Sequence, residues 1–497
     1  MRRLLAVLLY SLPACVLAGT PLIDAINGED VPAALKLIDG GADVRAKLSD
    51  GTTALHYAAH AGNLELANRL IKAGASVNAR NDYGSTPMQE AAERGDATLI
   101  RALLKAGADP NTANDEGETA LMTVARTGNV EAAKLLIKAR ANVNAVESWR
   151  GQTALMWAAA QSNPEMVQLL LKSGAKPDVI STVRDWARKV TAEPRPQNRP
   201  PGGFTALLLA AREGCAACAQ ALIKGHADLN LTNPENITPL LEAILNARFD
   251  TAKVLIESGA DVNRWDVWGR APLYSAIDYN TTPRGGRPDR PSSDATLPLD
   301  IAKMLLDRGA NPNMQLKLFP PYRSLGQDRG GDALLTVGTT PLLRAAKAGD
   351  VEATKLLLQY KALPDLPNNL GATPLLAAAG VNWSLTDIRG RFHNEQQCIE
   401  TAKLLIAAGA NVNAVNERGQ TSLHAATQQG WTQFVRFLAA NGARLDVKDR
   451  GGATALDIAV GRAGGASRPG VSGPEAHPET AAALRELLAA SGATAAR

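Results

Sequence analysis

The chain has 497 residues, with 53 basic and 49 acidic side chains, and 45% of its residues are hydrophobic. This balance is typical of a soluble globular protein and excludes a disordered chain or a polytopic membrane protein. The formal charge of only +4 argues against nucleic-acid binding, which usually needs a strongly basic face. Seven Trp, seven Tyr and six Phe are few for this length, so the core must consist mainly of Ala, Leu, Val and Ile.

The segment 1–18 has the pattern of a secretory signal peptide. Arg2 and Arg3 precede an apolar run, and Val16-Leu17-Ala18 ends in small residues. We expect cleavage after Ala18 and an exported protein, periplasmic or extracellular, with no membrane span. The alternative is a lipoprotein anchored through Cys15, but the short apolar run and Pro13 count against it.

A 33-residue repeat dominates the rest of the chain. Its first sequence motif occurs eleven times, for example as Thr86-Pro-Met-Gln-Glu-Ala-Ala and Thr340-Pro-Leu-Leu-Arg-Ala-Ala. The copies begin at Thr53, Thr86, Thr119, Thr153, Thr205, Thr238, Ala271, Thr340, Thr373, Thr421 and Thr454. Most intervals equal the period or nearly so, but those that follow Thr153, Ala271 and Thr373 are clearly longer. A second sequence motif, such as Gly259-Ala-Asp-Val-Asn, follows most copies of the first.

Each copy predicts two short helices. Thr is a good N-cap, Pro suits the first helical turn, and the Leu and Ala positions bury one face. A Gly such as Gly62, Gly95, Gly214 or Gly349 then ends the first helix with positive φ. One copy cannot bury its apolar face alone, so neighbouring copies must stack.

These two motifs and their 33-residue spacing resemble the ankyrin repeat. The resemblance covers nearly all of the chain after the signal and implies an all-α solenoid of about 12 helix-turn-helix units, with β-hairpin turns and loop insertions. The family His, a structural hydrogen-bonding residue, is present only as His56 and His424, and Gln89 and others replace it. In repeats that lack this His, we expect the sequence to specify the local structure less strongly.

The repeat pattern and its interruptions define the expected segments. They are the signal peptide 1–18, an N-terminal capping unit 19–50, repeats 51–180, a Pro/Arg-rich insertion 181–203, repeats 204–313 with an insertion 280–297, an insertion 314–337, repeats 338–460 with an insertion 381–397, a flexible loop 461–478 and a C-terminal capping helix 479–497. Alternating residues in 314–337 predict an extended β-hairpin.

Two sets of residues are candidates for partner binding. Insertions in a solenoid often lie on its binding face, and Arg and aromatic residues gather in those of units eight to ten. The first set is Tyr274, Tyr322, Arg323, Arg389, Arg391 and Phe392. The resemblance implies a second set, because ankyrin proteins usually bind through hairpin tips and inner helices. That set is Tyr57, Tyr83, Trp149, Trp157, Trp265 and Trp268. The alternatives are that the insertions are neutral loops and that these aromatic rings pack locally.

Motifs for chemistry are largely missing from the sequence. Cys215 and Cys218 lie at the start of a helix without a thioredoxin-like context, which indicates a local disulfide or two buried small residues. The Cys and His spacing matches no zinc motif, and no nucleophile elbow or nucleotide fingerprint occurs. We therefore expect no catalytic residues, no cofactor and no metal.

The sequence favours a non-catalytic, monomeric scaffold that binds a protein or peptide in an exported compartment, similar to secreted bacterial ankyrin-repeat proteins. Two alternatives stay open. The insertions of units eight to ten could form a small-molecule, anion-binding or enzymatic pocket, or the protein could be a secreted effector with a host target. Fold alone does not decide among them.

Overall fold

The chain is a stack of helix pairs, as the repeat predicts. The computed structural model describes residues 21–184, 200–281, 292, 294–318, 334–381, 394–462 and 475–492. These residues contain 24 α-helices and no strands, only two isolated β-bridges. The helices fall into two compact units, residues 1–176 and 177–497, which we call the N-terminal and C-terminal units.

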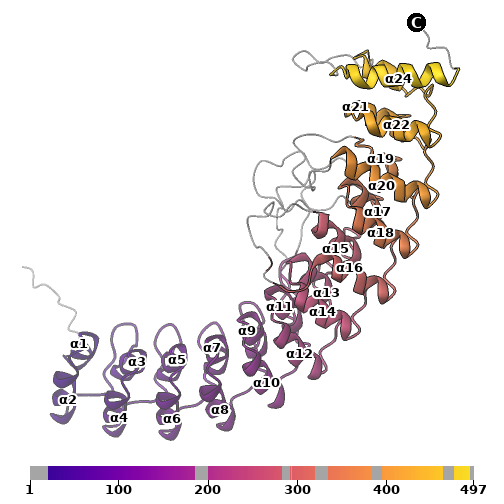
Figure 1. Cartoon of the computed structure of the whole chain (residues 1–497). Coiled ribbons are helices and arrows are strands. Elements are labelled where there is room, and N and C mark those ends of the chain that lie inside the picture. The colour runs from indigo at the N-terminus through magenta and orange to yellow at the C-terminus, as the bar shows by residue number, and fades with distance from the viewer. Residues whose placement is uncertain are drawn as a thin grey trace, which may run out of the picture. The chain divides into compact units, whose positions relative to one another are not determined.

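The N-terminal unit holds five helix pairs (Figure 1). The first helices of the pairs are α1 (Pro21–Asn27), α3 (Ala54–His60), α5 (Pro87–Glu93), α7 (Ala120–Thr127) and α9 (Ala154–Ala160). The second helices are α2 (Val31–Asp39), α4 (Leu64–Lys72), α6 (Ala97–Lys105), α8 (Val130–Lys138) and α10 (Pro164–Lys172). Within this unit, neighbouring first helices pack on one another, and so do neighbouring second helices.

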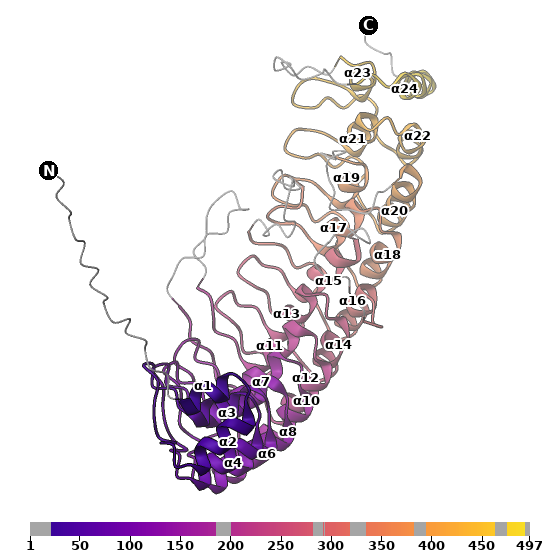
Figure 2. The ribbon, with the colours of Figure 1, turned by 90° about the vertical axis from the view of Figure 1, so that its left-hand side faces the viewer.

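The C-terminal unit holds seven pairs, and Figure 2 shows its first and second helices as two rows. The first helices are α11 (Ala206–Glu213), α13 (Pro239–Leu245), α15 (Pro272–Thr281), α17 (Pro341–Lys347), α19 (Pro374–Ala378), α21 (Ser422–Gln428) and α23 (Ala455–Ala459). The second helices are α12 (Ala216–Lys224), α14 (Phe249–Glu257), α16 (Pro298–Asp307), α18 (Val351–Gln359), α20 (Glu395–Ala407), α22 (Thr432–Ala440) and α24 (Pro478–Ala490).

Helix ends follow the sequence signals. The hydroxyl of Thr340 accepts from the backbone N–H of Leu343 at 3.1 Å, and Pro341 occupies the first turn of α17. Gly62, Gly95, Gly214 and Gly349, which the sequence places after first helices, have φ values of 70°, 66°, 85° and 62°. At Gly214 an added Cβ would also lie 2.6 Å from Cδ of Arg248, so both backbone and space favour glycine.

Asparagine side chains join several repeats to the next. Asn111 donates from Nδ2 to the carbonyl of Arg140 at 3.1 Å and accepts from the N–H of Asn142 at 2.7 Å. Asn78 and Asn144 make the same pair of bonds one repeat before and one repeat after. Asn263, Asn313 and Asn413 do so in the C-terminal unit. These bonds satisfy backbone groups of the loops and fix the register between neighbours.

A second bridge runs from the first helix of one repeat to the loop before the next. His56 Nδ1 accepts from the Thr53 N–H at 3.2 Å, and Nε2 lies 3.1 Å from the Ser85 carbonyl oxygen. His424 does the same with Thr421 and Ala453. Gln89 reproduces the arrangement, with Oε1 accepting from Thr86 N–H and Nε2 donating to the Glu118 carbonyl at 2.8 Å. The expectation of weaker specification is therefore wrong at Gln89, because an amide offers the same acceptor and donor.

The insertions differ from expectation at their edges. Helix α15 continues to Thr281, and α20 begins at Glu395, so both neighbouring insertions are shorter than predicted. The ends of 181–203 are held together, with Ser181 N–H donating to the Phe204 carbonyl at 2.9 Å. In 314–337 the residues that the structure describes form no strand, although Gly338 N–H donates to the Leu316 carbonyl at 2.7 Å. Most of the predicted β-hairpin, residues 319–333, lies outside the described residues.

Because both bridging histidines are buried, stability should depend on pH. Desolvation lowers the pKa of His56 and of His424, so the unfolded chain binds more protons than the folded chain between the folded pKa values and about 6.5. The stability that these two histidines contribute is complete above about pH 6.5 and is lost as the pH falls through their folded pKa values.

We expect the double variant His56→Gln/His424→Gln to keep the fold, as Gln89 does, and to lose less stability between pH 7.5 and pH 5. Urea unfolding of the wild type and the variant at both pH values measures how much free energy of unfolding each one loses. The other titrating groups are the same in both proteins, so their contributions cancel in the comparison. An equal loss in both proteins would contradict the assignment.

Candidate functional site

The repeat register places equivalent side chains of successive first helices next to one another. In the N-terminal unit, the fourth residue after each capping Thr is Tyr57, Glu90, Thr123 or Trp157. The seventh residue is His60, Glu93 or Arg126 in three of these repeats. Tyr57, Glu90 and Trp157 are half-buried, whereas His60, Glu93 and Arg126 are exposed. We call these seven residues the first-helix face; it mixes aromatic and charged groups.

Trp157 and Arg126 interact across two repeats of this face. The Arg126 guanidinium lies over the indole ring, 5.3 Å from its centroid. A cation–π contact of this kind contributes about 0.5–1 kcal/mol at an exposed position. The Trp157 Nε1–H is buried without a hydrogen-bond acceptor among the residues that the structure describes. The ring is therefore held in place by packing and by the cation above it.

Two aromatic side chains project from the loops that precede first helices. Tyr83 is 71% exposed and Trp149 is 58% exposed. They occupy equivalent loop positions two repeats apart, with the loop that contains Glu116 between them. The buried carboxylate of Glu147 holds the second loop, because it accepts from the N–H groups of Trp149, Arg150 and Gln152. A rigid loop that presents a large ring is suited to contact a partner at low entropic cost.

The C-terminal unit has a cleft beside Trp265. It has a volume of about 530 Å³, and its lining includes Trp265, Met314, Lys317 and Val337. The Lys317 ammonium lies 4.0 Å from the centroid of the Trp265 ring. The cleft therefore places one predicted partner-binding residue beside the base of the insertion 314–337.

Trp268 and Tyr274 do not lie on a surface. Trp268 is 0% exposed and Tyr274 is 3% exposed. Arg270 covers the Trp268 ring at 4.8 Å and donates to Asp266 at 2.6 Å, so the indole belongs to a buried loop core. Including these two side chains among surface partner-binding residues is wrong, because neither is accessible. Trp268 lies at the base of its loop, and Tyr274 lies on the buried side of α15.

The other candidates of the insertions, Tyr322, Arg323, Arg389, Arg391 and Phe392, lie outside the described residues. Near the insertions, the buried Arg344 of α17 donates to Asp278 of α15 at 2.7 Å. Asn280 donates to the buried Asp350 at 2.6 Å. These polar contacts tie α15 to α17 and its following turn. Because Arg344 is already paired and enclosed, it serves the packing of first helices and offers no open anion site.

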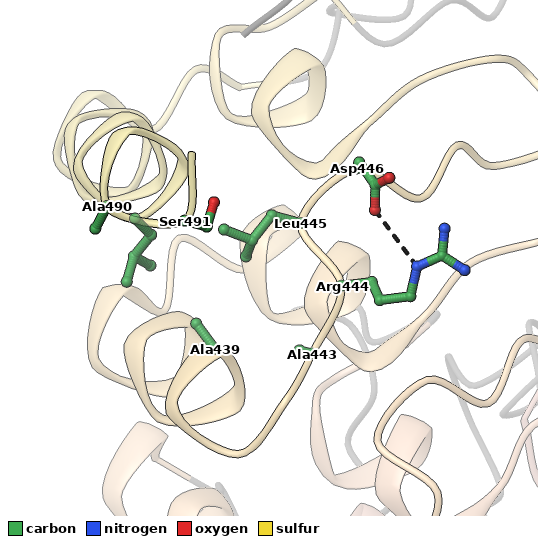
Figure 3. Close-up of a pocket in the computed structure, with 8 residues that line it drawn as sticks. Ala439, Ala443, Arg444, Leu445, Asp446, Ala490 and Ser491 are labelled. Atoms are coloured by element: carbon green, nitrogen blue, oxygen red, sulfur yellow. Dashed lines mark ion pairs between the residues drawn. The ribbon is translucent and has the colours of Figure 1, made fainter. Parts of the chain in front are cut away.

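The last repeat has an open cleft between the loop before α23 and helices α22 and α24. Figure 3 shows Leu445 and Ser491 at this cleft, with Arg444 paired to Asp446 at 3.5 Å. Its volume is about 490 Å³, and Ala439, Ala443, Leu487 and Ala490 complete the lining. The lining thus combines small apolar side chains with Ser491 and the exposed Arg444–Asp446 pair.

The cysteines behave as structural residues. Cys215 and Cys218 form a disulfide at the start of α12, which agrees with the first of the two sequence alternatives. Cys398 is buried in α20, and burial raises the pKa of its thiol. A protonated, buried thiol is a poor nucleophile.

Comparisons with known proteins agree with this architecture. A model described as ankyrin repeats in three copies matches residues 22–114, 90–181, 190–266, 207–315 and 393–466, and a single ankyrin-repeat model matches 337–369. None of the helices that the structure describes is long and apolar enough to cross a membrane.

Among curated proteins, the mouse B-cell lymphoma 3 protein homolog is 32% identical over 144 residues, which cover 28% of each chain. Human neurogenic locus notch homolog protein 1 is 30% identical over 202 residues, 36% of this chain and 8% of that protein. The chain thus spans less than a third of either relative.

Two solved structures are similar. The ankyrin repeat domain of Bcl-3 has 28% identity and a TM-score of 0.38, with coverage of 48% of this chain and 98% of that one. The human ASB11 ankyrin repeat domain has 22% identity and a TM-score of 0.40, with coverage of 49% and 99%.

The contrast between Trp268 and Trp149 is testable. We expect Trp268→Ala to destabilise the protein by about 3–5 kcal/mol, because it removes a fully buried ring. Trp149→Ala should change stability by no more than about 0.5 kcal/mol, as is usual at an exposed position. Urea unfolding monitored by circular dichroism compares the two variants. Equal destabilisation would contradict the placement of Trp268 in the core.

Proposed function

Because the chain belongs to the ankyrin-repeat family, we propose that it is a non-catalytic scaffold that binds a protein or peptide through the N-terminal unit. Ankyrin repeats are protein-binding scaffolds. The choice of the N-terminal unit rests on four aromatic side chains, which lie at two kinds of position in the repeat although the chain has few aromatic residues. Tyr57 and Trp157 belong to the first-helix face, and Tyr83 and Trp149 lie on the preceding loops.

The physical properties of this surface fit a polypeptide partner. Exposed rings on fixed loops supply apolar contact area, while Glu90, Glu93 and Arg126 supply charged groups between them. Binding hot spots are typically large aromatic or Arg side chains surrounded by polar groups that close around them. The buried Arg344–Asp278 pair, in contrast, gives no support to an enzymatic or anion-binding pocket.

We also propose that the protein is exported and acts in the periplasm or outside the cell. The positive, apolar and small-residue sequence of 1–18 supports this, and a Cys215–Cys218 disulfide is compatible with an oxidising compartment.

The partner site is tested with the double variant Tyr83→Ala/Trp149→Ala. A protein captured by the full chain from an extract of the source compartment is identified and purified, and its Kd is measured by isothermal titration calorimetry. We expect the double variant to weaken binding at least about 30-fold, because one hot-spot ring contributes about 2 kcal/mol.

The matched control is Leu363→Ala, which removes a 52% exposed side chain from the C-terminal unit. It should leave the Kd unchanged. The proposed surface is wrong if the double variant binds as tightly as the wild type, or if only the control loses affinity.

Export is tested by expression of the full chain in a Gram-negative host, fractionation and intact mass measurement. We expect a periplasmic or secreted product that begins at Gly19, and Ala18→Arg should block its processing. A cytoplasmic product that retains Met1, or a lipid-modified Cys15, would refute cleavage after Ala18.

A further inference from the structure

Three potential metal ligands converge on the first-helix face. His60 lies at the end of α3, and Glu90 and Glu93 lie on α5 of the next repeat. One ligand atom from each side chain can be chosen so that all three lie within 4.8 Å of one another. His60 Nδ1 and Glu90 Oε2 are 3.0 Å apart. The cluster thus combines an imidazole with two carboxylates from two rigid helices.

We propose that His60, Glu90 and Glu93 bind a divalent transition metal, with Zn²⁺ the best match. Zinc takes His nitrogen and carboxylate oxygen ligands at about 2.0–2.2 Å, and two such ligands in a tetrahedron are about 3.3 Å apart. The observed separation of 3.0 Å between His60 Nδ1 and Glu90 Oε2 requires a small outward shift, and the exposed Glu93, whose oxygen lies within 4.8 Å of both, has to move toward them. Mg²⁺ and Ca²⁺ are poorer matches, because both prefer oxygen ligands alone.

Neighbouring groups hold the Glu90 carboxylate in an orientation suited to binding a metal. Its side chain is only 18% exposed, and Ser85 Oγ donates to its Oε1 at 2.7 Å. This second bond leaves Oε2 directed at His60 and fixes the carboxylate orientation, as outer hydrogen bonds do at metal sites.

The coordination would be incomplete with protein ligands alone. Three side chains leave a fourth tetrahedral position for water or for a group from outside the chain. His60 is 67% exposed, so solvent can reach this side of the cluster. The site does not depend on a protein partner, and metal binding can be tested without one.

The direct test is isothermal titration of ZnCl₂ into the full chain, purified with a chelator that is then removed. We expect one zinc ion per chain, and MgCl₂ should give no comparable heat. His60→Ala and Glu90→Gln should each weaken zinc binding at least about 10-fold, and Ser85→Ala should weaken it less.

The matched controls change a His and a Glu outside the cluster. His226 is exposed with a φ of 64°, which Asn tolerates, and Glu65 is an exposed residue of α4. His226→Asn and Glu65→Gln should leave zinc affinity unchanged. Circular dichroism establishes that every variant is folded.

Co²⁺ gives a second readout, because tetrahedral coordination produces strong visible absorption bands that His60→Ala should abolish. The proposal is overturned if zinc does not bind, if His60→Ala and Glu90→Gln bind it as tightly as the wild type, or if His226→Asn weakens binding as much as they do.

Discussion

The hydrogen bond from a side chain of one repeat to the backbone of the next is the constraint on which the structure depends. Stacked aliphatic side chains supply most of the burial, but their attraction is non-directional. Asn111 bridges two loops, and Gln89 bridges a helix start to the following loop. Each bond has one geometry, and a shifted register would leave unpaired the buried or partly buried backbone groups that Gln89 bonds. The polar bridges therefore convert a repeated apolar pattern into a single alignment.

This alignment determines which side chains lie together on the first-helix face. Positions four and seven after the capping Thr vary between repeats, and apart from the buried Thr123 they lie at or near the surface of the first helix, while the two residues between them, such as Ala58 and Ala59, are buried. Tyr57, Glu90 and Trp157 therefore belong to one row, although each comes from a different repeat. The same register brings His60 to Glu90 and Arg126 to Trp157. Function can change at these positions without loss of the stack.

The sequence predicted the elements with a strong local cause. Thr caps, Pro at first turns and Gly at positive φ located the helix pairs, and Cys215 and Cys218 suggested their own disulfide. It failed where tertiary contacts decide. Trp268 belongs to the set expected at hairpin tips or inner helices, but Arg270 and Asp266 enclose it. Alternation in 314–337 suggested strands that its edges do not form. The His60–Glu90–Glu93 cluster was missed because its ligands come from two different repeats, although aligning the repeats by their capping Thr would have revealed it.

The central claim is that the first-helix face and its preceding loops form the surface at which a partner binds. Hydrogen–deuterium exchange of the full chain, with and without its captured partner, measures this surface directly. The account predicts that peptides covering 54–60, 83–94, 119–127 and 149–160 become protected, while α4, α6 and α8 exchange as before. Protection confined to those second helices, or to the C-terminal unit, would contradict it.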